Sequence, residues 1–289
     1  MPIPAGTGAP VPNPPVCAAW GLPERIAVSG GTVAAGVFGQ GPPVVLVHGT
    51  PAWSYLWRGV ARRLAEHRTV YLWDMLGFGD SHPAAGVAPT IARQAAVLAE
   101  LVEHWGLEAP ALVGHDIGGG VVARAHLVEG VPASALALVD AAVLGPWNTP
   151  FTDHQQRHAE AYRTMPADVF ADLAALRLRS ATRAPLPEEA VAAYLAPWAG
   201  QSGQRRWLDQ VAAVSHEDTR EAVRRLGSVA VPTLVLWGGQ DAWLPPETGE
   251  RLAAAIPGAR LRTVADAGHF LPEDAPEDAA AALLAHAGI

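Results

Sequence analysis

A carboxylate stands at the centre of a Gly-x-Asp-x-Gly turn at residues 114–118, where an apolar segment gives way to a helical pattern. Small residues at Gly114 and Gly118 are typical of a sharp strand-to-helix turn, which holds the middle side chain, Asp116, above the edge of a sheet. The positive N-terminal end of the following helix is expected to lie under Asp116 and to favour its ionised form. An ionised carboxylate in this position is a nucleophile, so the turn predicts covalent catalysis.

The choice of a carboxylate nucleophile limits the reactions that this turn can carry out. Attack of Asp116 on an ester would form an anhydride by expelling an alkoxide, a far stronger base than a carboxylate, so that step mostly reverses. Attack on a saturated carbon that bears a halide or an epoxide oxygen forms a stable alkyl ester, which activated water can hydrolyse at its carbonyl. We therefore predict an Asp-nucleophile hydrolase. The alternative is that Asp116 only caps the N-terminus of the helix, a position that Asp favours.

Three further segments supply the other groups that such a hydrolase needs. A tight turn after an expected strand carries Thr50, whose backbone N–H would form an oxyanion hole together with the N–H of Ile117. His269, in a loop after the last expected strand, is the predicted general base. Asp241 follows a buried strand and is expected to orient the imidazole, and Asp140, which follows an earlier strand, is the alternative acid.

The elements that position these groups alternate between short apolar runs and amphipathic helical patterns, which is typical of a parallel α/β sheet. Most of the later runs are continuously apolar, as expected of strands that are covered on both faces. We expect eight strands, at residues 25–29, 32–38, 44–47, 70–73, 111–113, 135–139, 233–237 and 260–264. We expect helices at residues 56–67, 91–105, 118–126, 248–256 and 278–286.

The alternation stops between residues 146 and 226, which read as helices and turns without a strand. We expect this segment to form a helical cap, inserted after the sixth strand, over an α/β core made of residues 24–145 and 227–289. In an open α/β sheet ligands bind beyond the carboxyl ends of the strands, so the cap would cover the site. Residues 1–23 are expected to form a proline-rich arm.

The composition of the 289 residues argues against several other classes of protein. The net charge of −8 disfavours nucleic acid and anionic membranes as partners, and no apolar stretch is long enough for a transmembrane helix. The single cysteine, Cys17, cannot form an internal disulfide, and the N-terminus lacks the pattern of a signal peptide, so we expect a cytoplasmic protein. No pair of histidines has a metal-ligand setting, and we expect neither a metal nor a cofactor. The sequence indicates no particular oligomeric state.

Together these residues resemble the α/β-hydrolase fold superfamily, in the branch with an Asp nucleophile that contains epoxide hydrolases and haloalkane and haloacetate dehalogenases. The similarity spans about residues 24–287 and includes HGTPAWSYLWR at residues 48–58 and DMLGFGDS at residues 74–81. The resemblance implies a mostly parallel eight-stranded sheet flanked by helices, with the cap after strand 6. The chain departs from haloalkane dehalogenases at Ile117, where they usually carry a halide-holding tryptophan, and at Thr50, where they commonly carry Asn or Glu.

The resemblance leaves two reactions open. Epoxide hydrolases of this branch protonate the ring oxygen with cap tyrosines, and Tyr162 and Tyr194 lie in the expected cap, so we expect an epoxide hydrolase with a small apolar substrate. A haloalkane or haloacetate dehalogenase is the alternative, and its halide would have to be held by cap residues. A small-molecule binder, or a lyase that uses Asp116 as a base, is the alternative of another class. The aromatic side chains also expected to bind substrate are Trp53, Trp147, Trp198 and Trp207.

Overall fold

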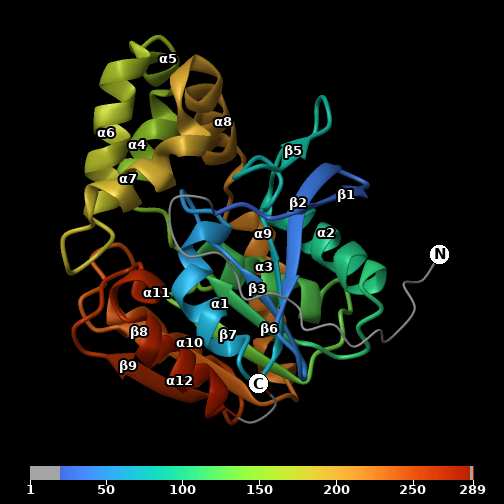
Figure 1. The fold of residues 1–289 in the computed structure, drawn as a ribbon. Helices are drawn as coiled ribbons and strands as arrows, with labels where there is room; N and C mark the ends of the chain where they lie inside the picture. Colours follow the sequence, from blue (N-terminus) through green and yellow to red (C-terminus); the bar gives the residue numbers. More distant parts are fainter. Residues whose placement is uncertain (1–19, 287–288) are drawn as a thin grey trace.

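The computed structural model describes residues 20–286 and 289, so Cys17 and most of the expected proline-rich arm lie outside the described residues. A twisted sheet runs through the centre of the molecule (Figure 1), with its strands in the order β1-β2-β4-β3-β6-β7-β8-β9 and with β5 paired to β2. The six strands from β4 to β9 in this order are parallel. Strand β2 runs antiparallel to both of its neighbours, β1 and β4. The strands are β1 (Glu24–Val28), β2 (Gly31–Phe38), β3 (Pro43–Val47), β4 (Thr69–Trp73), β5 (His82–Pro83), β6 (Ala111–His115), β7 (Ala135–Val139), β8 (Thr233–Gly238) and β9 (Arg260–Val264).

The eight long strands coincide with the eight apolar runs of the sequence, each within two residues at either end. Strands β6, β7 and β8 are buried at every position, because helices cover both faces of this part of the sheet. The sheet nevertheless has nine strands and not eight. The ninth, β5, is too short to show an apolar pattern. It forms only because it pairs with the first two residues of β2, Gly31 and Thr32.

Helices of the core pack in two groups against the sheet. Helix α1 contacts α12, whereas α2 and α9 both contact α3. Helix α2 shows how the sequence sets such an element: the hydroxyl of Thr90 accepts a hydrogen bond from the N–H of Arg93 at its start, and apolar side chains at three- and four-residue spacing face the core. The core helices are α1 (Arg58–Leu64), α2 (Ile91–His104), α3 (Ile117–Leu127), α9 (Glu217–Arg225), α10 (Pro246–Ala255), α11 (Leu271–Asp274) and α12 (Pro276–Leu284).

Between β7 and β8 the described chain forms helices and no strand. Helices α4 to α8 gather at one end of the molecule (Figure 1), and we call these five helices the cap. Helix α9, which the sequence analysis assigned to the same insertion, packs on α2 and α3 and belongs to the core. In the described part of the chain, no helix is both long and apolar enough to cross a membrane. The cap helices are α4 (Pro150–Arg157), α5 (Ala159–Arg163), α6 (Ala167–Arg179), α7 (Glu188–Leu195) and α8 (Gly200–Ala213).

Candidate active site

The turn that carries Asp116 joins β6 to α3 and is sterically tight. Asp116 has a φ of 51° and a ψ of −124°, a backbone conformation that L-residues rarely adopt. A Cβ atom at Gly114 would overlap the backbone oxygen of Gly118, and one at Gly118 would overlap that of His48, so both positions require glycine. Helix α3 starts directly after the turn, at Ile117, and the Asp116 side chain stands at the carboxyl end of β6.

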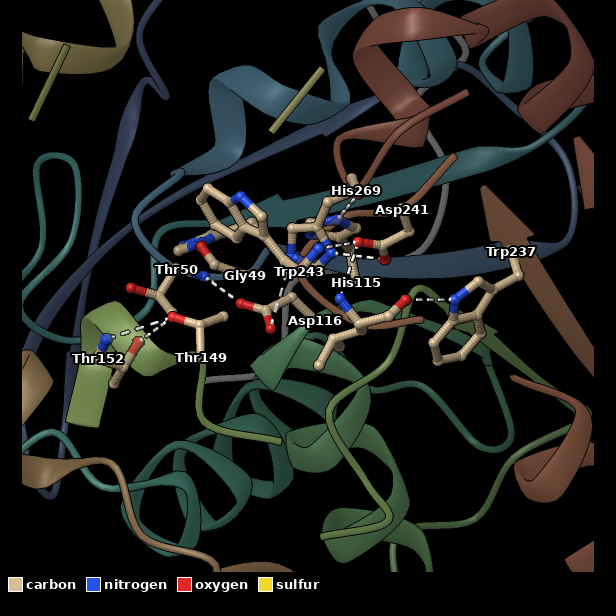
Figure 2. Close-up of polar contacts among 12 residues, drawn as sticks. Gly49, Thr50, His115, Asp116, Thr149, Thr152, Trp237, Asp241, Trp243 and His269 are labelled. Carbon is tan, nitrogen blue, oxygen red and sulfur yellow. Dashed lines mark hydrogen bonds and ion pairs between the residues drawn. The ribbon is translucent and has the colours of Figure 1, made fainter. Parts of the chain in front are cut away.

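The Asp116 carboxylate is held by backbone N–H groups on one side. The N–H of Thr50 donates to Oδ2 at 2.8 Å (Figure 2). The N–H of Ile117 lies near enough to the carboxylate to lower its pKa. The side chain makes no capping hydrogen bond to α3, so the alternative that Asp116 serves only as a helix cap does not hold. The other carboxylate oxygen, Oδ1, faces the imidazole of His269, whose Nε2 lies 3.8 Å away.

Burial raises the pKa of Asp116 above its ordinary value, because the carboxylate loses most of its hydration. The charge of His269 and the N–H groups of Thr50 and Ile117 lower this pKa and offset part of the burial effect. The helix start therefore favours the ionised form, as expected, but burial outweighs it and the net pKa is raised. The ionised form of Asp116 depends mainly on these three neighbours.

His269 is fixed between two carboxylates. Its Nδ1 lies 2.9 Å from Oδ2 of Asp241, and Oδ1 of Asp241 accepts hydrogen bonds from the N–H groups of Trp243 and Leu244 at 2.8 and 2.9 Å. Its Nε2 has no hydrogen-bond partner in the described chain and faces Asp116. Burial by itself lowers the pKa of His269, but the charges of Asp241 and then Asp116 raise it, and the net result is a raised pKa.

Asp140, the alternative acid, makes a different hydrogen bond from the one that holds the imidazole. The hydrogen bond to His269 comes from Asp241, whereas Oδ1 of Asp140 accepts from the N–H of Gly238 at 2.7 Å. Burial raises the pKa of Asp140 well above its ordinary value, and the charge of Asp241 raises it further. Asp241, and not Asp140, is therefore the carboxylate that contacts and orients the imidazole.

A cavity lies between these core residues and the cap. The core side contributes Asp116, His269 and Trp243, and the cap side is partly polar. In the described chain the buried amide nitrogens of Gln155 and Gln210 have no hydrogen-bond partner. The cap and the segment leading into it line this cavity with Trp147, Asn148, Thr149, Phe151, Thr152, Gln155, Arg177, Trp207, Gln210, Val211 and Val214.

The sequence analysis missed Gln210 and Arg177, which lie on α8 and α6 of the cap. Oε1 of Gln210 accepts a hydrogen bond from the Thr50 hydroxyl at 2.8 Å, which leaves Nε2 as a free donor at the cavity. Thr50 and Gln210 are separated by 160 positions in the chain. Neither Gln210 nor Arg177 follows a strand or lies in a motif. The only available signal was their position in the expected cap.

Two of the four predicted tryptophans, Trp147 and Trp207, line the cavity, and the other two do not. The indole N–H of Trp53 donates to the backbone oxygen of Ala193, and that of Trp198 donates to the backbone oxygen of Pro51. Both hydrogen bonds cross from core to cap. Trp53 and Trp198 therefore hold the cap on the core, because a buried indole N–H needs an acceptor and the facing backbone supplies one.

The expected tyrosine acids also lie elsewhere. The Tyr194 hydroxyl donates to Oε2 of Glu273 at 2.6 Å, and the Tyr162 ring packs edge-on against the rings of Phe151 and His154. None of the four tyrosines of the chain lines the cavity. The prediction that Tyr162 or Tyr194 contacts substrate is therefore corrected, because packing inside the cap and the partner Glu273 direct these side chains away from Asp116.

Comparison with known proteins agrees with this fold. A family model described as alpha/beta hydrolase fold matches residues 42–276, and the chain belongs to this family. It is 32% identical to "Haloalkane dehalogenase 2" of Mycobacterium tuberculosis, with 86% of this chain and 89% of the relative covered, and 27% identical to "Soluble epoxide hydrolase" of a Corynebacterium species, with 83% and 87% covered. The crystal structure of an alpha/beta hydrolase fold protein from Burkholderia ambifaria has a TM-score of 0.87 and 36% identity, with 91% of this chain and 97% of that chain covered. The protein is a hydrolase of the dehalogenase and epoxide hydrolase type.

Proposed function

We propose that the protein is a hydrolytic dehalogenase, in which Asp116 displaces a halide from a saturated carbon and His269 drives hydrolysis of the resulting ester. The observation that carries this proposal is the set of residues at the cavity: Gln155 and Gln210 line it and each has an amide nitrogen without a hydrogen-bond partner in the described chain, whereas no tyrosine lines it. The oxygen that leaves an opening epoxide is a strong base and needs an acidic proton donor. A departing halide is a weak base, so hydrogen-bond donors suffice. The similarity to a haloalkane dehalogenase supports the same choice.

The first step forms an ester on Asp116. Oδ1 attacks the carbon that bears the halogen, and the carbon–halogen bond breaks as the carbon–oxygen bond forms, so the halide leaves with the electron pair. Oδ2 stays with the N–H of Thr50 and becomes the carbonyl oxygen of the ester. The halide is held by Nε2 of Gln210, whose orientation is set by the Thr50 hydroxyl. Related dehalogenases commonly carry Asn or Glu at the position of Thr50, in the core itself. Here an amide donor from the cap, that of Gln210, lies beside Thr50.

The second step hydrolyses the ester. Nε2 of His269 accepts a proton from the water that attacks Cγ of Asp116, and Asp241 stabilises the imidazolium that forms. Negative charge develops on Oδ2, which already accepts a hydrogen bond from the N–H of Thr50, and the N–H of Ile117 is the second donor of this oxyanion hole. The Cγ–Oδ1 bond then breaks, and His269 returns the proton to the alcohol. The alcohol carries away Oδ1, and the oxygen of the water remains in the carboxyl group. The second proton of the water leaves this group for solvent, so Asp116 is again a carboxylate.

A single turnover in ¹⁸O-labelled water tests this proposal. With an excess of enzyme over a reactive haloalkane, we expect halide release, an unlabelled alcohol and the ¹⁸O label in the peptide that contains Asp116. The variant Asp116→Ala should release no halide, whereas Asp172→Ala, which changes an exposed carboxylate on α6, should behave as wild type. Label in the alcohol after one turnover refutes the covalent route. Diol formation from epoxides without halide release from any haloalkane refutes the dehalogenase and supports an epoxide hydrolase, and the absence of any covalent product supports the binder or lyase.

A further inference from the structure

Arg177 places a positive charge in the active-site cavity without a carboxylate partner. The side chain extends from α6 of the cap and lines the same cavity as Asp116 and His269. Its guanidinium carbon lies 3.3 Å from the centre of the Trp243 ring, and that ring stacks on the ring of His269 with centroids 4.8 Å apart. Nη2 donates to the hydroxyl of Thr149 at 3.0 Å. In the described chain Arg177 has no carboxylate within ion-pair distance.

A second half-buried arginine shows how the fold treats such a charge elsewhere. Arg58 makes a two-point contact with Glu273, with nitrogen–oxygen distances of 2.5 and 2.6 Å. Burial lowers the pKa of Arg58, but the hydrogen bonds and charge of Glu273 outweigh it and the net pKa is raised. Burial lowers the pKa of Arg177 to about 10, although the charges of Asp116 and Asp241 act in the opposite direction. The fold thus neutralises the cation at Arg58 and leaves the cation at Arg177 without a counter-charge of its own, which favours an anionic ligand.

We propose that Arg177 binds a carboxylate group of the substrate, so that the enzyme acts on halogenated carboxylic acids. A guanidinium presents two parallel N–H groups that match a carboxylate, and the Trp243 ring fixes the plane in which they lie. The halogen-bearing carbon then faces Asp116, and the carboxylate faces Arg177 in the same cavity. Arg177 also offsets the repulsion between the charge of Asp116 and an anionic substrate. This inference rests on the proposed function and adds the chemical class of the substrate.

The test compares acids with neutral compounds of the same length. We expect wild-type enzyme to release chloride from 3-chloropropanoate or 4-chlorobutanoate with a kcat/KM at least about tenfold above that for the corresponding amides. The variant Arg177→Gln should raise KM for the acid by about 10- to 100-fold, and the preference for the acid over the amide should fall by a similar factor. Arg179→Gln is the matched control, because Arg179 lies on the same helix and pairs with the exposed Glu188.

Binding of butanoate gives a readout that does not depend on chemistry. Wild-type enzyme should bind butanoate in calorimetry, and a folded Arg177→Gln protein, verified by its thermal unfolding, should bind it at least about tenfold more weakly. Equal binding to the two proteins overturns the inference, and so does a change that is confined to inhibition by chloride, since Arg177 would then hold the leaving halide. If Asp116 hydrolyses only neutral haloalkanes, the inference fails while the proposed function stands. If neither acids nor neutral compounds release halide, both fail.

Discussion

Replacement of His269 by alanine should stop the reaction at the alkyl ester. Nε2 of His269 lies 3.8 Å from Oδ1 of Asp116, and Nδ1 is hydrogen-bonded to Asp241, so the imidazole is the base of the water step. It affects the displacement of halide only through its charge, which lowers the pKa of Asp116. The N–H groups of Thr50 and Ile117 that hold the Asp116 carboxylate are unaffected. A positioned general base contributes about 10²- to 10⁴-fold to rate. We therefore expect a burst of one halide per enzyme, followed by turnover that is slower by about the same factor.

The assay combines rapid-quench halide release with mass spectrometry of the intact protein. The mass should increase by that of the substrate less its halogen atom, and proteolysis should locate the adduct on Asp116. His269→Gln provides a matched control, because an amide N–H can still donate to Asp241 while the general base is lost, and it should trap the same ester. The double variant with Asp116→Ala should show no burst. Repeated turnover by His269→Ala at nearly the wild-type rate, without an adduct, would contradict the role given to the imidazole.

Three further measurements test the arrangement around this centre. Steady-state turnover should decrease as the pH falls through the raised pKa of His269, because the protonated imidazole cannot accept a proton from water, and a profile flat from pH 8 to 5 would contradict this. Asp241→Asn should lower kcat by about 10³- to 10⁴-fold and Asp140→Asn by less than about tenfold, as measured by halide release, because only Asp241 holds the imidazole. Tyr194→Phe should lower the free energy of unfolding, measured in urea titrations, by about 1–3 kcal/mol, because the lost hydroxyl donates to Glu273. Because that hydroxyl lies outside the cavity, kcat should stay within about twofold of wild type. A large loss of kcat would instead assign Tyr194 a catalytic role.

Much of the sheet could be predicted because its strands are buried on both faces, which makes each of them a continuous apolar run in the sequence. The residues now found together at the site, Asp116, Asp241 and His269, each follow the carboxyl end of a strand. In a parallel sheet these ends meet at one edge, so local sequence was enough to bring the three together. Strand β5 escaped prediction because two residues carry no periodicity.

The cap could not be read in the same way. A helical period shows that one face of a helix is apolar, but the direction in which its polar side chains point depends on how the helices dock. The tyrosines of the cap therefore looked suitable as acids, whereas packing directs Tyr194 to Glu273 and brings Gln210 to Thr50 across 160 residues of chain. The sequence by itself determined the sheet and the placement of Asp116 and His269, the proposed nucleophile and base, after the ends of its strands. Only the tertiary structure decided which cap residues line the cavity with Asp116 and that burial raises the pKa of Asp116. It also decided that Arg177 lies in this cavity with no carboxylate partner among the described residues. These three features depend on contacts between the cap and the core.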